Sequence, residues 1–421
     1  MNNKVLPPDF VHLVNEHYGS ADAQCLCDSL LNTEPEVSVR LNSRKINAVE
    51  SLCITGQGSP LSSASPVEWC PDAYYLAERP PFTFDPLLHA GVYYVQEASS
   101  MYIAEFCRRF LPMQAPCCAL DLCAAPGGKS TLLAGLLPEG SFLLSNEPIT
   151  KRAQVLSENM QKWTRMPDNA EYPVRSMVTN NYPADFRAFE KCFDIVVTDV
   201  PCSGEGMFRK DEQAVAEWSM ENVLRCVERQ QGILSDIWHA LKPGGLLIYS
   251  TCTFNRFEDE ENARWICSEL GAELLEERHF LPGRDRGEGF YCAAIRKDDV
   301  SASSSDAMPD KTASEFAIEA EKIQRKAKTL LRIMPPAFRC EGPVVELTYD
   351  QALAYLRRET VRTVAPTGML TLSYCGIPLG PGKCVPGRIN NQYPDSWRIK
   401  TTYTKSWSLF DIKENVDNQS Q

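Results

Sequence analysis

Residues 119–130, ALDLCAAPGGKS, decide the fold of this chain. A short apolar run ends at Asp121, and a pair of glycines then leads into a polar stretch near Lys129. This order predicts a buried strand, a tight loop and a helix, the unit from which parallel sheets are built. Glycines let a ligand approach the backbone, and the N-terminus of a helix favours an anionic group. The loop is therefore a candidate binding site, with a purely structural turn as the alternative.

The ligand of this loop is narrowed by two nearby positions. An ATP phosphate loop, GxxxxGK[ST], needs its first glycine at position 123, where this chain has Cys123, so that motif is excluded. Glu147 ends the apolar run SFLLSNE (141–147), 18 residues after Lys129. A carboxylate at this point accepts hydrogen bonds from ribose hydroxyls in Rossmann-type sites. Together, the loop and Glu147 favour a ligand that contains ribose over a solvated carboxylate.

Further apolar runs alternate with helical patterns along the chain. The runs are VRSMVT (174–179), FDIVVTDV (193–200) and GLLIYSTCTF (245–254), and apolar residues recur at helical spacing over 223–241. Strands that alternate with helices predict an α/β fold with a doubly wound, Rossmann-like sheet. The chemistry is then expected at the carboxyl ends of the strands.

Two cysteines follow neighbouring strands of this predicted sheet. VVTDVPCSGEG (196–206) contains Asp199 and Cys202, and YSTCTFN (249–255) contains Cys252. A lone cysteine at a strand end is usually part of the core, but neighbouring strands lie about 4.8 Å apart, so two such thiols can reach one substrate atom. A thiolate that adds to C6 of cytosine makes C5 able to attack a sulfonium methyl group, and a second thiol can assist release. Asp199 suits pairing with cytosine N3 and the exocyclic amine.

Composition and charge indicate a globular chain with an uneven charge distribution. The 421 residues carry a net charge of −12, but residues 321–421 contain 15 Lys and Arg against 9 Asp and Glu, while the rest contains 28 against 46. A basic C-terminal part suits an RNA partner. No membrane segment or signal peptide is expected, which makes the cytoplasm the expected compartment. The 17 cysteines form no CxxC pairs, so most are expected to be reduced thiols and no metal site is predicted.

The expected domain order has four segments. Residues 1–100 would form a small N-terminal α/β domain that contacts RNA, and residues 101–297 the Rossmann-like domain. Residues 298–320, DDVSASSSDAMPDKTASEFAIEA, are small and polar, and they predict a flexible linker. Residues 321–421 would form the basic C-terminal module, and a monomer is expected.

At this point the motifs resemble a known family. CAAPGGK (123–129), NE (146–147), DVPCSGEGMFRK (199–210) and STCT (250–253) look like the signature of the Nol/Nop/Sun RNA 5-methylcytosine methyltransferases. GVYYVQEASSM (91–101) is similar to the lead-in to that family's catalytic domain. The extended PCSGEGMFRK and PLGPGKCVPGRINNQYPDSWRIK (378–400) resemble the RsmF type, which modifies bacterial small-subunit ribosomal RNA.

The resemblance implies roles for individual residues. Cys252 would be the nucleophile, Cys202 the releasing thiol, and Asp199 a contact to cofactor or base. S-adenosylmethionine would be held by Cys123, Ala124, Ala125, Pro126, Gly127, Gly128, Lys129, Glu147, Asn181 and Asp199. The family's aspartate near the adenine is missing in VTNNYPADF, so Asn181 or Tyr182 would take its place.

The resemblance also implies RNA contacts outside the sheet. The C-terminal module would be a β-rich domain of the PUA kind, with Arg388, Tyr393, Trp397, Arg398 and Lys400 exposed to RNA; the alternative is a β-barrel with a solvated basic face. Cations interleaved with aromatic rings suit loop or single-stranded RNA. Arg40 and Asn42, in VRLN, match a family RNA-contact motif, with a structural role as the alternative.

Three alternative functions differ in what they require of the sequence. A tRNA cytosine methyltransferase would share all the chemistry. A catalytically silent RNA-binding or ribosome-assembly protein would lack Cys252 or the glycine loop, and both are present. Methylation of a protein or small molecule would not explain two strand-end cysteines. Ribosomal RNA, possibly within a ribosomal subunit, is the expected substrate.

Overall fold

The computed structural model describes residues 5–49, 52–53, 59–167, 170–299, 313–401 and 407–412. The chain divides into two compact units, each built from separated segments. Unit 1 comprises Met1–Glu36, Glu97–Leu156 and Pro173–Met334, and unit 2 comprises Val37–Gln96, Ser157–Tyr172 and Pro335–Gln421. Helix α7 (Thr150–Thr164) begins in residues of unit 1 and ends in residues of unit 2. Within the described ranges, no helix has the length and apolar character needed to cross a bilayer.

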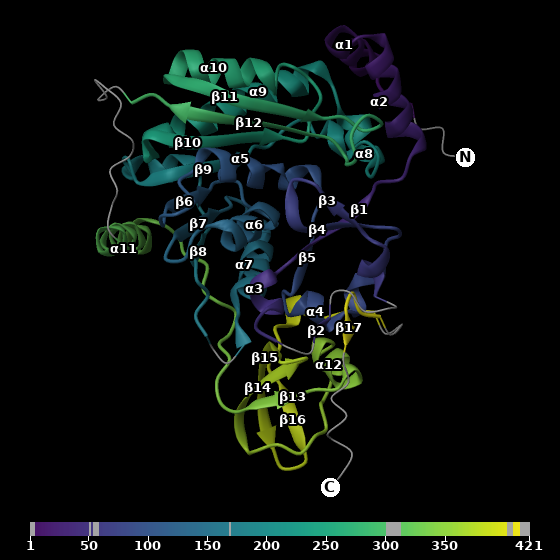
Figure 1. Cartoon of the computed structure of the whole chain (residues 1–421), viewed down its shortest axis with the longest axis vertical. Helices are drawn as coiled ribbons and strands as arrows, with labels where there is room; N and C mark the ends of the chain where they lie inside the picture. The colour runs from purple at the N-terminus through teal and green to yellow at the C-terminus, as the bar shows by residue number, and fades with distance from the viewer. Residues whose placement is uncertain are drawn as a thin grey trace. The chain divides into compact units, whose positions relative to one another are not determined.

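Unit 1 is built on a seven-stranded sheet (Figure 1). Its strands are β6 (Cys118–Asp121), β7 (Phe142–Asn146), β8 (Arg175–Thr179), β9 (Phe193–Asp199), β10 (Leu241–Thr251), β11 (Ala272–Phe280) and β12 (Phe290–Lys297). They lie in the order β11-β12-β10-β9-β6-β7-β8. The five from β10 to β8 are parallel, whereas β12 is antiparallel to both of its neighbours, β10 and β11. The predicted α/β, Rossmann-like sheet is confirmed, and β9 lies directly between β10 and β6.

Helices and an apolar cluster complete unit 1. The helices are α1 (Pro8–Tyr18), α2 (Ser20–Asn32), α5 (Ile103–Phe110), α6 (Gly128–Leu136), α8 (Glu212–Glu217), α9 (Met220–Ile237), α10 (Glu260–Leu270) and α11 (Ala313–Leu330). The first two pack against the loops after β9 and β10 through Phe10, whose ring lies 5.1 Å from Phe208 and 6.4 Å from Phe254. Residues 5–36 therefore share the core of the sheet unit rather than that of residues 37–96.

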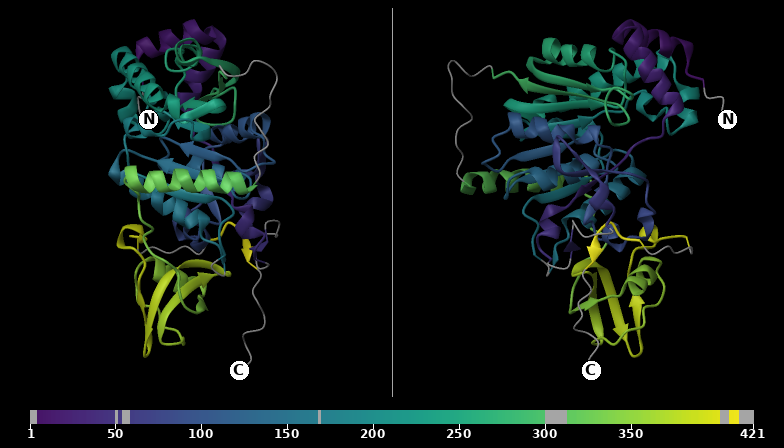
Figure 2. Two further views of the ribbon diagram at one scale, coloured as in Figure 1. Left: turned by 90° about the vertical axis from the view of Figure 1, so that its left-hand side faces the viewer. Right: turned by 45° about the vertical axis from the view of Figure 1, so that its right-hand side comes forward.

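Helix α11 corrects the predicted linker. It begins at Ala313, so residues 313–320 are helical, while 300–312 lie outside the described residues. Its apolar positions, which include Phe316, Ala320 and Ile323, belong to the same core cluster as the sheet residue Leu120. Figure 2 shows α11 in light green alongside the blue strands of this unit. The composition is polar overall, but spacings of three and four gather the few apolar residues on one face.

Unit 2 joins the segment after residue 36 to the C-terminal module. The first contributes β1 (Val37–Leu41), α3 (Ser43–Ile46), β2 (Leu52–Cys53), β3 (Ser65–Val67), β4 (Cys70–Leu76), α4 (Pro86–His89) and β5 (Tyr93–Val95). The second contributes β13 (Val344–Glu346), α12 (Tyr349–Leu356), β14 (Gly368–Tyr374), β15 (Ile377–Val385), β16 (Arg388–Asn391) and β17 (Asp411–Ile412). The sheet β13-β14-β15-β16 gives the predicted β-rich C-terminal part. One apolar cluster contains residues of both segments, such as Val39 and Leu372.

Candidate active site

The predicted site residues of unit 1 follow adjacent parallel strands. Cys252 follows β10, Cys202 follows β9, the loop 123–129 follows β6, Glu147 follows β7 and Asn181 follows β8. Since the carboxyl ends of parallel strands meet at one edge of a sheet, these positions share an edge. The prediction that this edge carries the candidate site therefore rests on observed topology.

The two cysteines lie in contact. Cys202 Sγ is 3.3 Å from Cys252 Sγ. The loops that carry them are also joined by backbone, because the amide of Gly206 donates to the carbonyl of Cys252 at 2.7 Å. A Cβ at Gly206 would lie 2.9 Å from that carbonyl oxygen and 3.3 Å from Cys252 Cβ. Glycine at this position of PCSGEG is thus required for the close approach of the two loops.

The thiol contact makes the two cysteines chemically different. The hydrogen bond to Cys252, together with burial, holds the pKa of Cys202 well above its usual value. Cys202 therefore keeps its proton and donates it toward Cys252. The two thiols are thus not equivalent, although they touch.

Buried carboxylates behind the cysteines were missed in the sequence. Glu205 accepts hydrogen bonds from the amide of Phe254 at 2.6 Å and from Trp218 Nε1 at 2.9 Å. Glu258 accepts from the amide of Ser203 at 3.0 Å. Burial, with repulsion from Glu258, raises the pKa of Glu205 to about 7. Each carboxylate ties one cysteine loop to the other or to its support, so both are positioning residues.

Asp259 fixes the backbone around Cys252 in the same way. Its Oδ1 accepts from Thr251 Oγ1 at 2.5 Å and from Thr253 Oγ1 at 2.9 Å, the hydroxyls on either side of the cysteine. Burial raises the pKa of Asp259 well above its usual value. The available signal was the acidic run FEDEEN (257–262), which looks like a solvated helix start.

The glycine loop has the expected strand, turn and helix. Gly127 has a φ of +118°, a left-handed conformation that favours glycine, and α6 begins at the next residue. The Ala125–Pro126 peptide bond is cis. Lys129, in the first turn of α6, forms an ion pair with Asp199 at 2.8 Å between Nζ and Oδ2. Ser250 Oγ donates to the other carboxylate oxygen of Asp199 at 3.0 Å.

Lys129 lies in the field of several acidic groups. Burial lowers its pKa, but Asp199, Asp121 and Cys252 raise it, and the balance lies above the usual value. Its ammonium therefore stays charged beside Cys252. Burial also raises the pKa of Asp121 to about 7. Ser130 donates to Oδ2 of Asp121 at 2.6 Å, whereas Oδ1 is buried without a hydrogen-bond partner in the described part of the chain.

Glu147 is buried but keeps acceptor capacity. Its Oε1 accepts from the amide of Ile149 at 2.9 Å, and Oε2 lies 3.6 Å from Arg152 Nη2. Arg152 also donates to the carbonyl of Ala125 at 3.0 Å, which joins the glycine loop to the end of β7. A carboxylate held in this way can accept hydrogen bonds from ribose hydroxyls.

Asn181 and Tyr182, the residues expected near an adenine, differ in how far their side chains are used within the protein. Asn181 Oδ1 accepts from the amide of Arg332 at 2.9 Å, and its Nδ2 donates to Asp185 at 3.2 Å. Both ends of the Asn181 side chain are thus used within the protein. The ring of Tyr182 is 70% exposed, so stacking by Tyr182 suits the position better than a hydrogen bond from Asn181.

The two VRLN residues that were expected to contact RNA are buried. Arg40 and Asn42 are only 2% and 1% exposed. The Arg40 guanidinium lies 4.3 Å from the ring of Trp163, and its Nε donates to Gln96 at 3.0 Å. Asn42 caps α3 and donates to the carbonyl of Trp163 at 3.0 Å. Both side chains hold unit 2 together, which is the structural alternative.

The C-terminal residues divide into two groups. Arg388, Arg398 and Lys400 are exposed. Tyr393 is buried, which corrects its expected exposure, and Trp397 is half-buried, with its ring 5.4 Å from Phe338. The cations can meet an RNA directly, whereas the aromatic rings mainly build the core of unit 2.

Comparison with solved structures defines the class of the fold. A methyltransferase homolog from Pyrococcus horikoshii matches with a TM-score of 0.53 at 21% identity, over 69% of this chain and 100% of that one. NSun6 from Pyrococcus horikoshii, solved with the S-adenosylmethionine analogue SFG, matches with a TM-score of 0.54 at 14% identity, over 70% and 99%. The fold is that of the Rossmann-like methyltransferases.

Family models and curated relatives define the family. Residues 110–296 match 16S rRNA methyltransferase RsmB/F, residues 6–98 the N-terminal domain of 16S rRNA methyltransferase RsmF, and residues 343–399 the methyltransferase RsmF PUA domain. The chain is similar to the RsmB/F methyltransferases over these three ranges, and the resemblance to the RsmF type is confirmed.

Relatives named "Ribosomal RNA small subunit methyltransferase F" match only in part. That of Cronobacter sakazakii is 32% identical over 62% of this chain and 56% of its own length. That of Aeromonas salmonicida is 30% identical over 70% and 65%. The chain thus spans between about half and two thirds of the length of these relatives.

Proposed function

We propose that this chain is an S-adenosylmethionine-dependent RNA cytosine-C5 methyltransferase that acts on small-subunit ribosomal RNA. The observation that carries the proposal is the contact of 3.3 Å between Cys202 Sγ and Cys252 Sγ, at the ends of adjacent strands and beside the glycine loop. The match to the RsmB/F family model supports the reaction, and the names of the relatives support the substrate. We propose that the protein works as a monomer in the cytoplasm.

The residues around the loop fit the cofactor. Glu147 offers a buried carboxylate to ribose hydroxyls, the ring of Tyr182 is open to stacking, and the first turn of α6 offers backbone amides. When bound, S-adenosylmethionine supplies an electrophilic methyl group. The loop 123–129, which includes Lys129, would line the cofactor site. Asn181 would line it with its backbone, because its side chain is hydrogen-bonded within the protein.

Cys252 would begin the reaction as a thiolate. Cys202 Sγ, at 3.3 Å, would donate a hydrogen bond to its sulfur. Its sulfur would add to C6 of a flipped or unpaired cytosine, which places electron density on C5. Asp199, held by Lys129 and Ser250, would accept a hydrogen bond from the exocyclic amine.

Cys202 would then act as the base for release. The contact with Cys252 is the main cause of its raised pKa, and bond formation at Cys252 removes that acceptor and its charge. Cys202 can therefore lose its proton to solvent when a base is needed. The thiolate would take the proton from methylated C5, whose electron pair restores the C5–C6 double bond and expels Cys252 Sγ.

Substitution of each cysteine tests this division of labour. With Cys252→Ala, we expect neither methylation nor a covalent protein–RNA adduct; with Cys202→Ala, we expect an adduct that resists denaturing electrophoresis. Methylation by the Cys252→Ala protein would sink the nucleophile assignment. Bisulfite sequencing of total RNA with and without the protein tests the substrate, since a lost site in tRNA would refute ribosomal RNA and leave the chemistry intact.

A further inference from the structure

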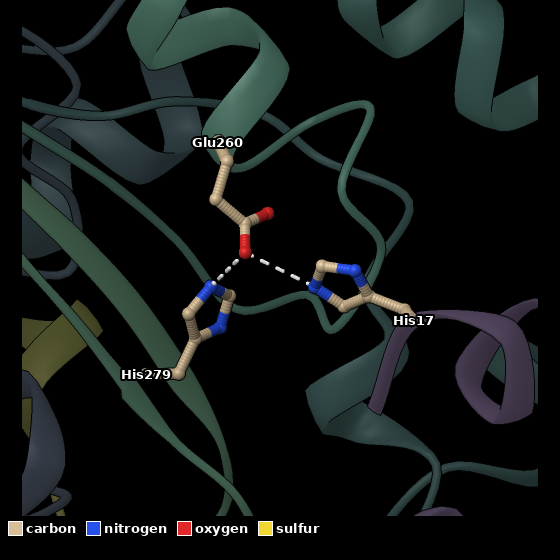
Figure 3. A group of neighbouring side chains, drawn as sticks. All are labelled: His17, Glu260 and His279. Atoms are coloured by element: carbon tan, nitrogen blue, oxygen red, sulfur yellow. Dashed lines mark hydrogen bonds and ion pairs between the residues drawn. The ribbon is translucent and has the colours of Figure 1, made fainter. Parts of the chain in front are cut away.

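Three polar side chains from distant segments of unit 1 meet away from the cysteines. His17 comes from α1, Glu260 begins α10 and His279 lies in β11 (Figure 3). Oε1 of Glu260 is 3.0 Å from His17 Nε2 and 2.8 Å from His279 Nε2. The side chains are 18%, 13% and 14% exposed in that order, so water screens them only in part.

The hydrogen bonds of Tyr18 determine which nitrogen of His279 carries hydrogen. The Tyr18 hydroxyl donates its single proton to the carbonyl of Phe254 at 2.9 Å, and that carbonyl can only accept. The contact of 3.2 Å between Tyr18 and His279 Nδ1 then requires Nδ1–H to be the donor. A neutral His279 consequently presents the lone pair of Nε2 to Glu260.

Two lone pairs face each other across this short contact unless a cation lies between them. Glu260 Oε2 is also buried without a hydrogen-bond partner among the residues that the structure describes. The carboxylate of the cluster thus has an oxygen with unused acceptor capacity.

We propose that His17, Glu260 and His279 bind a divalent first-row transition metal ion of the Zn²⁺ class. Two imidazole nitrogens and one carboxylate oxygen are a common ligand set for such ions, with water in the remaining position. The three ligand atoms lie within 4.8 Å of one another. Bonds of about 2.0–2.2 Å separate tetrahedral ligands by about 3.4 Å, so each histidine nitrogen would move away from Glu260 Oε1 by about 0.5 Å.

The surroundings support a bound cation. A metal-ligating histidine usually donates its second ring nitrogen to an oxygen acceptor, as His279 Nδ1 does to Tyr18. The sequence alone could not suggest this site, because its ligands come from three separate segments and none forms a local motif.

The ion would brace the candidate active site. It would join α1 to α10 and β11, and through Tyr18 it would reach Phe254, two residues after Cys252. Metal binding does not depend on the proposed methyl transfer, so the two proposals can fail separately.

The test is metal binding by the full chain after treatment with a chelator. Zn²⁺ affinity is measured by calorimetry for the unmodified protein and for His17→Gln, His279→Gln and His12→Gln, the last being the control because His12 lies exposed on the same helix. The visible and near-ultraviolet spectrum of the Co²⁺-loaded protein separates nitrogen and oxygen ligands from the 17 cysteines.

We expect one ion in the unmodified protein and in the His12→Gln control, with affinity about 10- to 100-fold lower in the two other variants. Co²⁺ should give visible bands without the charge-transfer absorption of thiolates. Equal affinity in all four proteins, thiolate absorption, or no binding by the unmodified protein would overturn the proposal; the last would leave a protonated imidazole as the cation. If His279→Gln fails to fold, His17→Gln at the N-terminal helix decides.

Discussion

The strand ends of unit 1 and the VRLN strand of unit 2 both carry polar residues that match family motifs, but they use them differently. At the strand ends, Cys202 contacts Cys252 and Lys129 pairs with Asp199, so that reactive atoms lie near an edge of the sheet. In VRLN, Arg40 and Asn42 are buried and bonded to their own unit. A motif therefore marks a constrained position, and only burial and partners tell whether the constraint is chemical or structural.

The largest expected effect comes from removing a charge at the strand ends. Lys129→Met should lower kcat/KM for methyl transfer about 10³-fold, because Asp199 loses its ion pair and Cys252 its nearby ammonium. The measurement is methyl incorporation into ribosomal RNA. The control is Lys151→Met, which removes an exposed lysine from α7. Equal rates for both variants would show that Lys129 has no role in the chemistry.

The matching change in VRLN should affect stability instead. Arg40→Met removes the contact with Trp163 and leaves Gln96 without its donor, so we expect the free energy of unfolding to fall by about 3 kcal/mol. Urea unfolding measures this loss, and Arg79→Met, at an exposed arginine of the same unit, is the control. RNA affinity of the folded fraction should not change. A specific loss of affinity without destabilisation would restore Arg40 as an RNA contact.

The sequence predicts the strand ends well for a physical reason. Apolar runs and the parallel-sheet rule suffice to bring Cys202, Cys252 and Glu147 to one edge. The roles of Glu205 and Asp259 are harder to predict from the sequence, because both resemble solvated loop residues until the partners that bury them are known. Burial of Arg40 depends on Trp163, 123 positions later in the sequence.

The boundaries of the two units cannot be predicted from the sequence, because they too depend on residues that are distant in the chain. The cluster that joins Val39 to Leu372 is built from residues far apart in the chain, and composition alone carries no sign of that pairing. The polar stretch before residue 321 looks disordered because apolar residues are few, yet α11 places Phe316 and Ala320 on one buried face. Long-range packing, rather than local pattern, decides both cases.

Asp121 is a buried acidic residue at the strand ends. Its pKa is raised by burial from 3.8 to about 7, so the folded state favours the protonated form. The contribution of Asp121 to the free energy of unfolding is therefore fully present below about pH 4, and it is lost as the pH rises towards and through 7. Asp121→Asn should remove this fall and stabilise the protein by about 2 kcal/mol at pH 8, less than the full shift because one amide hydrogen lacks an acceptor.

The measurement for Asp121 is urea unfolding between pH 4 and pH 8. The variant and the unmodified protein should differ most at the alkaline end. A constant difference across that range would mean that Asp121 is ionised throughout in the folded protein, in contrast to its expected protonation.

The smallest effects are expected at the C-terminal module, which contains both exposed cations and a buried tyrosine. Removal of an exposed cation, by Arg388→Ala, Arg398→Ala or Lys400→Ala, should weaken RNA binding a few-fold and reduce the salt dependence of log K by about 0.7 to 0.9. Tyr393→Phe should leave both unchanged, because its hydroxyl is buried without a hydrogen-bond partner among the described residues. Fluorescence anisotropy over a range of salt concentrations measures both quantities. If Tyr393→Phe weakened binding as much as the loss of a cation, burial would no longer separate structural from RNA-contacting residues in this module.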